Sequence, residues 1–208
     1  MVEQLRICLQ KILTANIFGV DKYLIHGTAI QRFPIRGSGD RNPLNMEVMK
    51  FAQKCGLGQH LSKTLFGISE ELLMNVLYDA PLASGAYDPS TFNRNSPVEL
   101  TPHEQGELTF GCDGQCFVLA ASDPFGALKR GTFFAYLKKI MKRDDTQGLI
   151  DTKKEGAGLG FFKMLYGCNA LICDVKAMQK TEVMALLDLR EPVRDFSMMP
   201  RSVHFFQI

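Results

Sequence analysis

The chain has 208 residues, of which 46% are hydrophobic and 22% charged, and its formal net charge is +2. This length and composition are typical of one domain with an appendage or of two small domains, and the low net charge excludes a general basic surface for nucleic acid. No apolar stretch is long enough to span a membrane, and charged residues interrupt the N-terminal segment, so it does not resemble a signal peptide. We therefore expect a cytoplasmic protein without nucleic-acid or membrane partners.

The six cysteines form no CxxC pair and no zinc-ligand spacing. We expect them to be reduced and mostly buried. A metal or redox site at Cys112 and Cys116 with His103 is a third functional class, which this spacing disfavours.

An amphipathic helix is predicted from Val2 to about Ala15. Its apolar residues on one side are Leu5, Cys8, Leu9, Ile12 and Leu13. Such a helix would suit dimerisation or docking to a partner protein. The Gly-, Asp- and Pro-containing run at residues 36–43 predicts a linker. We expect residues 1–43 to form a helical extension and linker, 44–190 the main domain and 191–208 a tail that packs on it.

Helices and strands follow in a mixed order. A helix capped by Asn45 is predicted first, and a second helix runs from about Leu61 to Tyr78, where Pro81 ends it. Two strands, 106–110 and 115–120, flank a predicted hairpin turn, and a basic helix covers 127–142. A short helix at 161–166 and strands at 170–175 and 181–189 complete the domain, and an irregular tail with an apolar end follows.

Three polar residues recur at intervals of four in the otherwise apolar second helix: Glu71, Asn75 and Asp79. This spacing places them on one helical face. An ordinary solvated helix edge explains the pattern, and so does a ligand site, since these groups would suit a hydrated divalent cation with phosphates.

Gly156, Gly158 and Gly160 directly precede a predicted helix. Glycines allow close backbone approach, and a helix N-terminus offers free N–H groups to phosphate. A plain glycine turn is the alternative, and the cluster fits neither the dinucleotide-binding fingerprint nor the P-loop.

Asp123 follows a predicted strand, and Thr181 begins another. A carboxylate at a strand end can accept a hydrogen bond from an exocyclic amine such as that of adenine. An Asp before Pro is also common in turns, and a β-branched Thr is common in strands.

The order of these features resembles that of the Bergerat-fold, or GHKL, ATP-binding domains of gyrase, heat-shock chaperones, sensor histidine kinases and anti-sigma-factor serine kinases. Residues 43–189 carry the resemblance, which is greatest for stand-alone histidine-kinase-like ATPase domains of the anti-sigma type. It implies an α/β fold, more specifically a two-layer α+β sandwich. A mixed sheet would be covered on one face by helices, with the helical extension at the N-terminus.

The resemblance implies roles for individual residues. The segment from Glu71 to Asn75 matches the family's N box, so Asn75 would bind Mg²⁺ and Glu71 would orient or deprotonate the attacking group. Asp123 matches the adenine-reading aspartate of the first glycine box, and Gly126, a further expected nucleotide-binding residue, is the only glycine of that box and is shifted from the family's positions. The remaining matches are the second glycine box (Gly156, Gly158 and Gly160) and the adenine-side Thr181.

The sequence also departs from the family pattern. Phe125 and Ala127 occupy the two glycine positions of the first glycine box, and Asp79 replaces the usual basic residue or His. Basic residues between the two glycine boxes form either a solvated helix face or, at Lys153 or Lys154, a closure over the phosphates.

Two functions follow from the resemblance. One is a regulatory domain that binds Mg-ATP and phosphorylates or sequesters a protein partner, as anti-sigma kinases do. Whether it would be a protein serine/threonine kinase or a weak ATPase is left open. The other is a catalytically inactive interaction module with a degraded nucleotide pocket.

Overall fold

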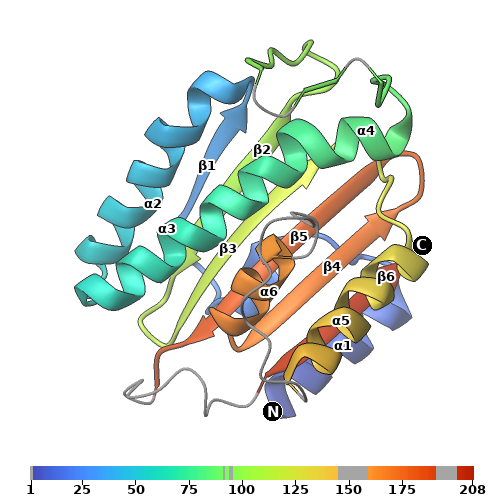
Figure 1. The fold of residues 1–208 in the computed structure, drawn as a ribbon. Helices are drawn as coiled ribbons and strands as arrows, with labels where there is room; N and C mark the ends of the chain where they lie inside the picture. The colour runs from blue at the N-terminus through green and yellow to red at the C-terminus, as the bar shows by residue number, and fades with distance from the viewer. Residues whose placement is uncertain (1, 91, 94–95, 145–158, 191–200) are drawn as a thin grey trace.

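The computed structural model describes residues 2–90, 92–93, 96–144, 159–190 and 201–208. Its centre is a mixed sheet of six strands in the order β1-β2-β3-β5-β4-β6 (Figure 1). Among the strand pairs of the described residues, β4–β6 is the only parallel one. The strands are β1 Ile30–Ile35, β2 Gly106–Cys112, β3 Cys116–Asp123, β4 Ala170–Lys176, β5 Lys180–Asp188 and β6 Ser202–Gln207.

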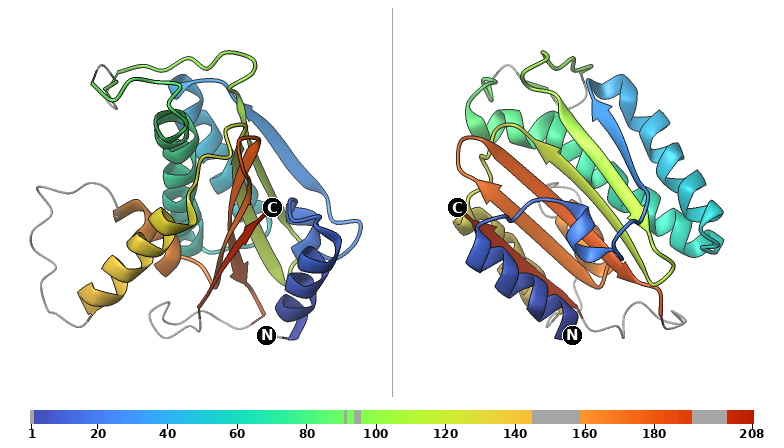
Figure 2. Two further views of the ribbon diagram at one scale, coloured as in Figure 1. Left: turned by 90° about the vertical axis from the view of Figure 1, so that its right-hand side faces the viewer. Right: turned by 180° about the vertical axis from the view of Figure 1, so that it is seen from behind.

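Helices cover one face of the sheet, and the N-terminal segment crosses the other (Figure 2). The first face carries α2 Arg41–Lys54, α3 Gln59–Met74, η3 Asn75–Asp79, α4 Ala80–Ser84, α5 Arg130–Asp144 and α6 Leu159–Tyr166. The opposite face carries α1 Val2–Thr14 and the 3₁₀ turn η1 Val20–Tyr23; a second 3₁₀ turn, η2 Ser38–Asp40, precedes α2. The predicted α/β class, a two-layer sandwich, is confirmed. None of the described helices has the length and apolarity to cross a membrane.

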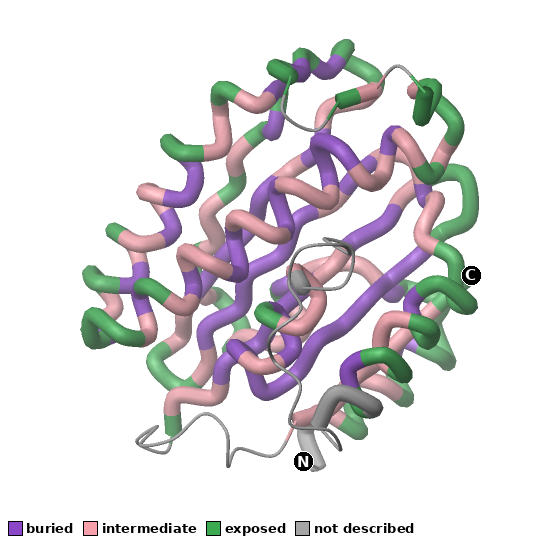
Figure 3. Tube along the Cα trace, viewed as in Figure 1, coloured by how far each residue is buried: buried purple, intermediate pink, exposed green. Residues whose placement is uncertain are grey.

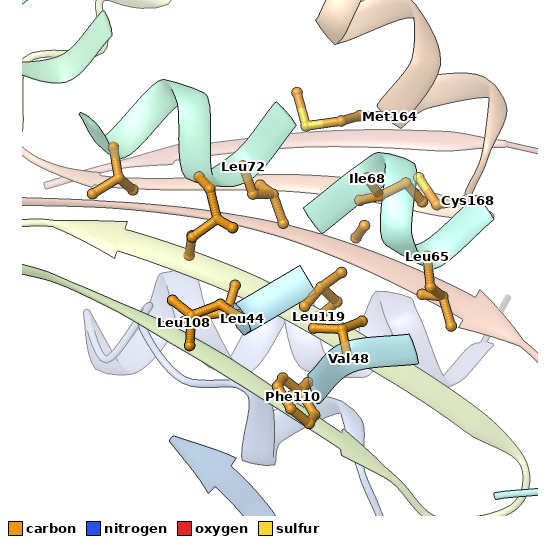
Figure 4. Packing of buried hydrophobic residues seen from close by; sticks show 14 of the residues in the cluster. Leu44, Val48, Leu65, Ile68, Leu72, Leu108, Phe110, Leu119, Met164 and Cys168 are labelled. Atoms are coloured by element: carbon orange, nitrogen blue, oxygen red, sulfur yellow. The ribbon is translucent and has the colours of Figure 1, made fainter. Parts of the chain in front are cut away.

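The main core lies between the sheet and the helices of the first face (Figure 4). Side chains alternate along β3, so Leu119 enters this core while Val118 and Ala120 enter a smaller core beneath η1. The inner strands are therefore buried on both faces, as the continuous purple trace in Figure 3 shows. This explains why the predicted strands read as nearly unbroken apolar runs.

The long helix does not end at Pro81. After α3 it widens into a π-helical turn, η3, in which the N–H of Ala80 donates to the carbonyl of Asn75, and α4 then continues. The wider turn comes just before the proline, which has no N–H to donate. It also buries the consecutive residues Val76, Leu77 and Tyr78.

Other local predictions were also wrong. Asn45 lies inside α2, where it is buried and donates to Glu70 of α3 at 2.7 Å, so it does not cap the helix. The apolar end of the tail forms β6, and β1, which was not predicted, pairs with β2. Helix α2 begins at Arg41, so the end of the predicted linker at residues 36–43 belongs to its first turn, whereas the division of the chain into domains stays a prediction.

Helix α1 is present, but its predicted apolar side faces outward. Leu5, Leu9, Ile12 and Leu13 are each more than half exposed, whereas Ile7 and Lys11 are buried against the sheet. Lys11 is drawn inward because it pairs with Asp174 of β4. The spacing of hydrophobic residues alone cannot predict this ion pair or the helix orientation that goes with it.

Candidate functional site

A cavity of about 430 Å³ opens between the long helix, the sheet, and the pair α5 and α6. It is lined by residues that are far apart in the sequence. Five of the predicted site residues line it: Glu71, Asn75, Asp123, Gly160 and Thr181. Gly126 does not line it, and Gly156, Gly158, Lys153 and Lys154 lie outside the described residues.

The helical side of the cavity carries the predicted polar stripe. Glu71 lies in the last turn of α3, and Asn75 and Asp79 are the first and last residues of the π-helical turn. All three line the cavity. The wider turn changes the angular spacing expected from an α-helix, yet both ends of the turn still face the same space.

The Glu71 carboxylate is held by α6. Its Oε1 accepts a hydrogen bond from Lys163 Nζ at 2.8 Å. Its Oε2 lies against Gly160, where an added Cβ would come within 2.2 Å of that oxygen. Only glycine at position 160 therefore allows the Glu71 carboxylate to lie this close to the backbone of α6. Gly160 is the second residue of α6, whereas the sequence predicted it just before the helix.

Asp123 and Thr181 form the sheet side of the cavity and face each other across the β3–β5 register. Asp123 Oδ1 accepts hydrogen bonds from the N–H groups of Phe125 at 2.9 Å and Gly126 at 3.3 Å. Burial raises the pKa of Asp123 to about 6, although these two N–H groups oppose the shift. A buried carboxylate beside a cavity is a candidate ligand-binding group.

The hydroxyl of Thr181 is buried and lacks a hydrogen-bond partner with acceptable geometry among the described residues. It is nevertheless close enough to Asp123 to lower the pKa of that carboxyl. Buried hydroxyls normally have a partner, either protein or water. The hydroxyl therefore lies beside the Asp123 carboxylate at the wall of the cavity, where a ligand or a water molecule could contact both groups.

Gly126 supports the site from behind. Its φ is +60°, and an added Cβ would lie 2.2 Å from the carbonyl oxygen of Lys176, the last residue of β4. The turn after Asp123 therefore packs directly on the neighbouring hairpin. Phe125 is not among the cavity-lining residues.

An apolar wall that was not predicted from the sequence closes the cavity on the side of α5 and α6. Phe133 of α5 is buried and packs edge-on against Phe161 of α6 at 5.2 Å, and Tyr136 lies 6.2 Å from the same ring. The spacing of Phe133 and Tyr136 on α5, and of Phe161 and Met164 on α6, was the available signal. Such spacing indicates that two residues share a helical face, but it does not indicate which part of the protein that face packs against.

The charge of the cavity is one-sided. The described residues that line it include Glu71, Asp79 and Asp123, but no lysine or arginine. Nor does the described part of the chain contain a group of three or more His, Cys, Asp or Glu residues arranged to hold a metal ion. The cavity therefore combines an apolar, partly aromatic chamber with a rim that carries carboxylates, of which Glu71 is paired with Lys163, and a cation would favour the entry of an anionic ligand.

The comparisons with known proteins identify no family. No protein-family model matches the sequence, and neither does any curated protein.

Proposed function

We propose that this chain binds a purine nucleotide, Mg-ATP, in the cavity between the long helix and the sheet. The observation that carries the proposal is that Glu71, Asn75, Asp123, Gly160 and Thr181 line one cavity. They were selected from the sequence for their resemblance to separate ATP-binding motifs. Chance resemblance gives no reason for the helix of Glu71 and Asn75, the strand pair of Asp123 and Thr181, and Gly160 of α6 to meet at one cavity.

The described groups fit the parts of such a ligand. The apolar wall with Phe133 suits the flat face of a base, and Asp123 suits its exocyclic amine. The Thr181 hydroxyl, which lies beside Asp123 at the cavity, suits a water molecule between the base and Asp123.

At the acidic rim, the Asn75 side chain would supply an oxygen to Mg²⁺. Magnesium usually keeps several waters and takes few protein ligands, so a single amide beside the phosphates is sufficient. The ion would also offset the repulsion between phosphates and the carboxylates of Glu71 and Asp79. In the family resembled, the acidic residue of the N box orients the attacking group, and Glu71 has that position.

The proposed role of the bound nucleotide is regulatory. By the same resemblance, the domain would act on a protein partner, either by phosphorylating a hydroxyl or by sequestering the partner in one nucleotide state. A second candidate is an inactive interaction module. It is favoured by the Glu71–Lys163 ion pair, because a carboxylate neutralised by lysine is a poor general base.

Calorimetric titration with Mg-ATP and Mg-ADP tests nucleotide binding. The wild-type chain should bind, Asp123→Asn should weaken binding at least tenfold, and Asn75→Ala should abolish the Mg²⁺ dependence. Asp21→Asn and Asn16→Ala, which change exposed residues, are matched controls and should bind as wild type. No binding at millimolar nucleotide would refute the proposal.

The two candidates separate once binding is established. Labelled ATP incubated with the chain and a cell lysate would reveal transfer to protein or release of phosphate. Lys163→Met should increase any such activity if the lysine restrains Glu71. A chain that binds nucleotide but shows neither reaction, with or without this substitution, is the interaction module.

A further inference from the structure

The outermost strand β6 has one unpaired edge among the described residues. Its inner edge pairs with β4: the N–H of Ser202 donates to Asn169 at 2.8 Å, and that of Ile208 donates to Val175 at 3.0 Å. Along a strand, the N–H and C=O groups of successive residues point alternately to the two edges. Since those of Ser202 and Ile208 point toward β4, those of every second residue between them, beginning with Val203, point outward. Their N–H and C=O groups are an open template for another strand. These residues are Val203, Phe205 and Gln207.

A helix lies on each face of β6, next to its outer edge. Figure 2, in the left view, looks onto this edge and shows β6 between α1 on one side and α5 on the other. On the α1 side, Gln4 and Cys8 contact Ser202 and His204 of β6 at 3.4 Å and 3.2 Å. Lys11 points further inward, to β4.

The exposed leucines of α1 lie beyond this edge. Positions advance about 100° per residue around a helix. Going around α1 from Lys11, which faces β4, through Cys8, which faces β6, the next positions are Ile12 and Leu5. These side chains are 67% and 61% exposed, and Leu9 and Leu13 follow them around the helix. The apolar stripe of α1 therefore begins where contact with β6 ends.

On the other face of the sheet, helix α5 also places exposed apolar side chains next to the edge of β6. Phe133 packs on Phe205 of β6 at 5.1 Å, and the next residue, Phe134, lies 6.3 Å from the same ring while remaining 44% exposed. Met141, two turns further along, is 65% exposed. Phe134 and Met141 are seven residues apart and share a helical face.

We propose that this edge is the interface with a second copy of the same chain, in which two β6 strands pair antiparallel. Antiparallel pairing of two identical strands places a two-fold axis perpendicular to the sheet. With that axis, corresponding faces of the two sheets lie on the same side of the joined sheet. Helix α1 therefore meets α1 of the partner, and α5 meets α5 of the partner. The apolar side chains of each helix would then be covered by the same side chains of the second copy.

The available area agrees with a self-association surface. Each of the exposed apolar side chains would bury on the order of 100 Å², or roughly 600 Å² per protomer, and the β6 edge adds its backbone. A standard interface buries about 800 Å² per partner. The helices and the strand together approach this size, whereas either helix alone would not. The side chains are Leu5, Leu9, Ile12, Leu13, Phe134 and Met141.

The oligomeric state of the full chain tests this inference independently of nucleotide. Light scattering during size-exclusion chromatography, and sedimentation over a concentration series, should give twice the monomer mass. The double variant Leu5→Glu/Ile12→Glu should raise the dimer dissociation constant roughly 30-fold or more. Its matched control, Ile25→Glu, changes a 55% exposed residue near the β2–β3 turn and should leave the dimer intact.

Gln207→Pro tests the strand pairing itself. It removes one outward N–H while leaving the hydrogen bonds of β6 to β4 in place, so it should weaken the dimer without unfolding the monomer. Circular dichroism and thermal unfolding would verify that each variant is folded. A chain that is monomeric at every concentration, or a dimer that tolerates both Leu5→Glu/Ile12→Glu and Gln207→Pro, would overturn the proposal.

Discussion

Lys11 Nζ lies 2.7 Å from Oδ2 of Asp174, and neither side chain is exposed to solvent. The rings of Phe206 and Tyr23 lie 4.9 Å and 5.0 Å from the same ammonium group. Burial lowers the pKa of Lys11 and raises that of Asp174 to about 6, and the mutual attraction of the two charges opposes both shifts. This pair therefore attaches α1 to the sheet and sets which side of the helix faces outward.

The first prediction concerns this buried pair. Lys11→Met should reduce the free energy of unfolding by about 3–5 kcal/mol, because it leaves the Asp174 carboxyl buried without its partner. Lys50→Met is the matched control, since Lys50 and its partner Glu47 are largely exposed, and it should change stability by less than about 1 kcal/mol. Urea unfolding measures both. Equal effects of the two substitutions would contradict the structural importance of the buried pair.

The same pair shows why sequence patterns predicted the fold better than the details of its packing. The inner strands β3, β4 and β5 were predicted because their apolar runs reflect burial on both faces. Helix α1 was predicted by its period, but not its orientation, since one buried ion pair outweighed four apolar residues. Strand β1 was missed because its sequence contains Pro34, which is tolerated at a sheet edge.

In the candidate site, too, some residues could be predicted from the sequence and others could not. Glu71, Asn75, Asp123 and Thr181 could be selected because each belongs to a short motif with a recognisable order. Lys163 could not, because its contact with Glu71 joins residues 92 positions apart and has no local signal. The aromatic wall could not be predicted either, because it is formed by α5 and α6, which are also separated in the sequence. Whether these residues bind nucleotide remains a prediction.

The second prediction concerns pH. Asp123 has a pKa of about 6 in the folded chain and about 3.9 when unfolded, so the folded state binds its proton more tightly. The contribution of this group to stability is therefore fully present below pH 4 and decreases as the pH rises through 6. Asp123→Asn should remove this decrease and stabilise the chain at pH 8 by about 2–3 kcal/mol.

Urea unfolding of the wild type and Asp123→Asn between pH 4 and pH 8 gives this difference directly. Asp174 also titrates near pH 6, but it is present in both proteins and cancels. Asp21→Asn should follow the wild-type profile. A constant difference between wild type and Asp123→Asn across this range would rule out the shifted carboxyl.

The third prediction concerns Gly126. Gly126→Ala should destabilise the chain by about 3 kcal/mol or more, because φ is +60° and the new Cβ would meet the backbone of the β4–β5 turn. Gly114 also has a positive φ, +85°, but has no atom within 4 Å of an added Cβ. Gly114→Ala should therefore cost only about 1 kcal/mol. Thermal and urea unfolding would compare them, and similar losses would show that strain alone, without close packing, accounts for Gly126.

The last prediction concerns Gly160, the glycine against which the Glu71 carboxylate lies. In helices, Gly→Ala normally stabilises by about 0.5–1 kcal/mol, and Gly67→Ala in α3 should do so, because nothing lies within 4 Å of its added Cβ. Gly160→Ala should not show this gain, because its Cβ would displace the carboxylate of Glu71 and separate it from Lys163.

A double-mutant cycle with Glu71→Gln and Lys163→Met isolates this contact. The coupling energy should be about 0.5 kcal/mol in the wild-type background, as expected for a partly exposed pair, and near zero in the Gly160→Ala background. The same cycle in the Gly67→Ala background should retain the wild-type value. If the coupling survives Gly160→Ala unchanged, the carboxylate does not depend on a glycine at this position, and another feature of α6 must position it.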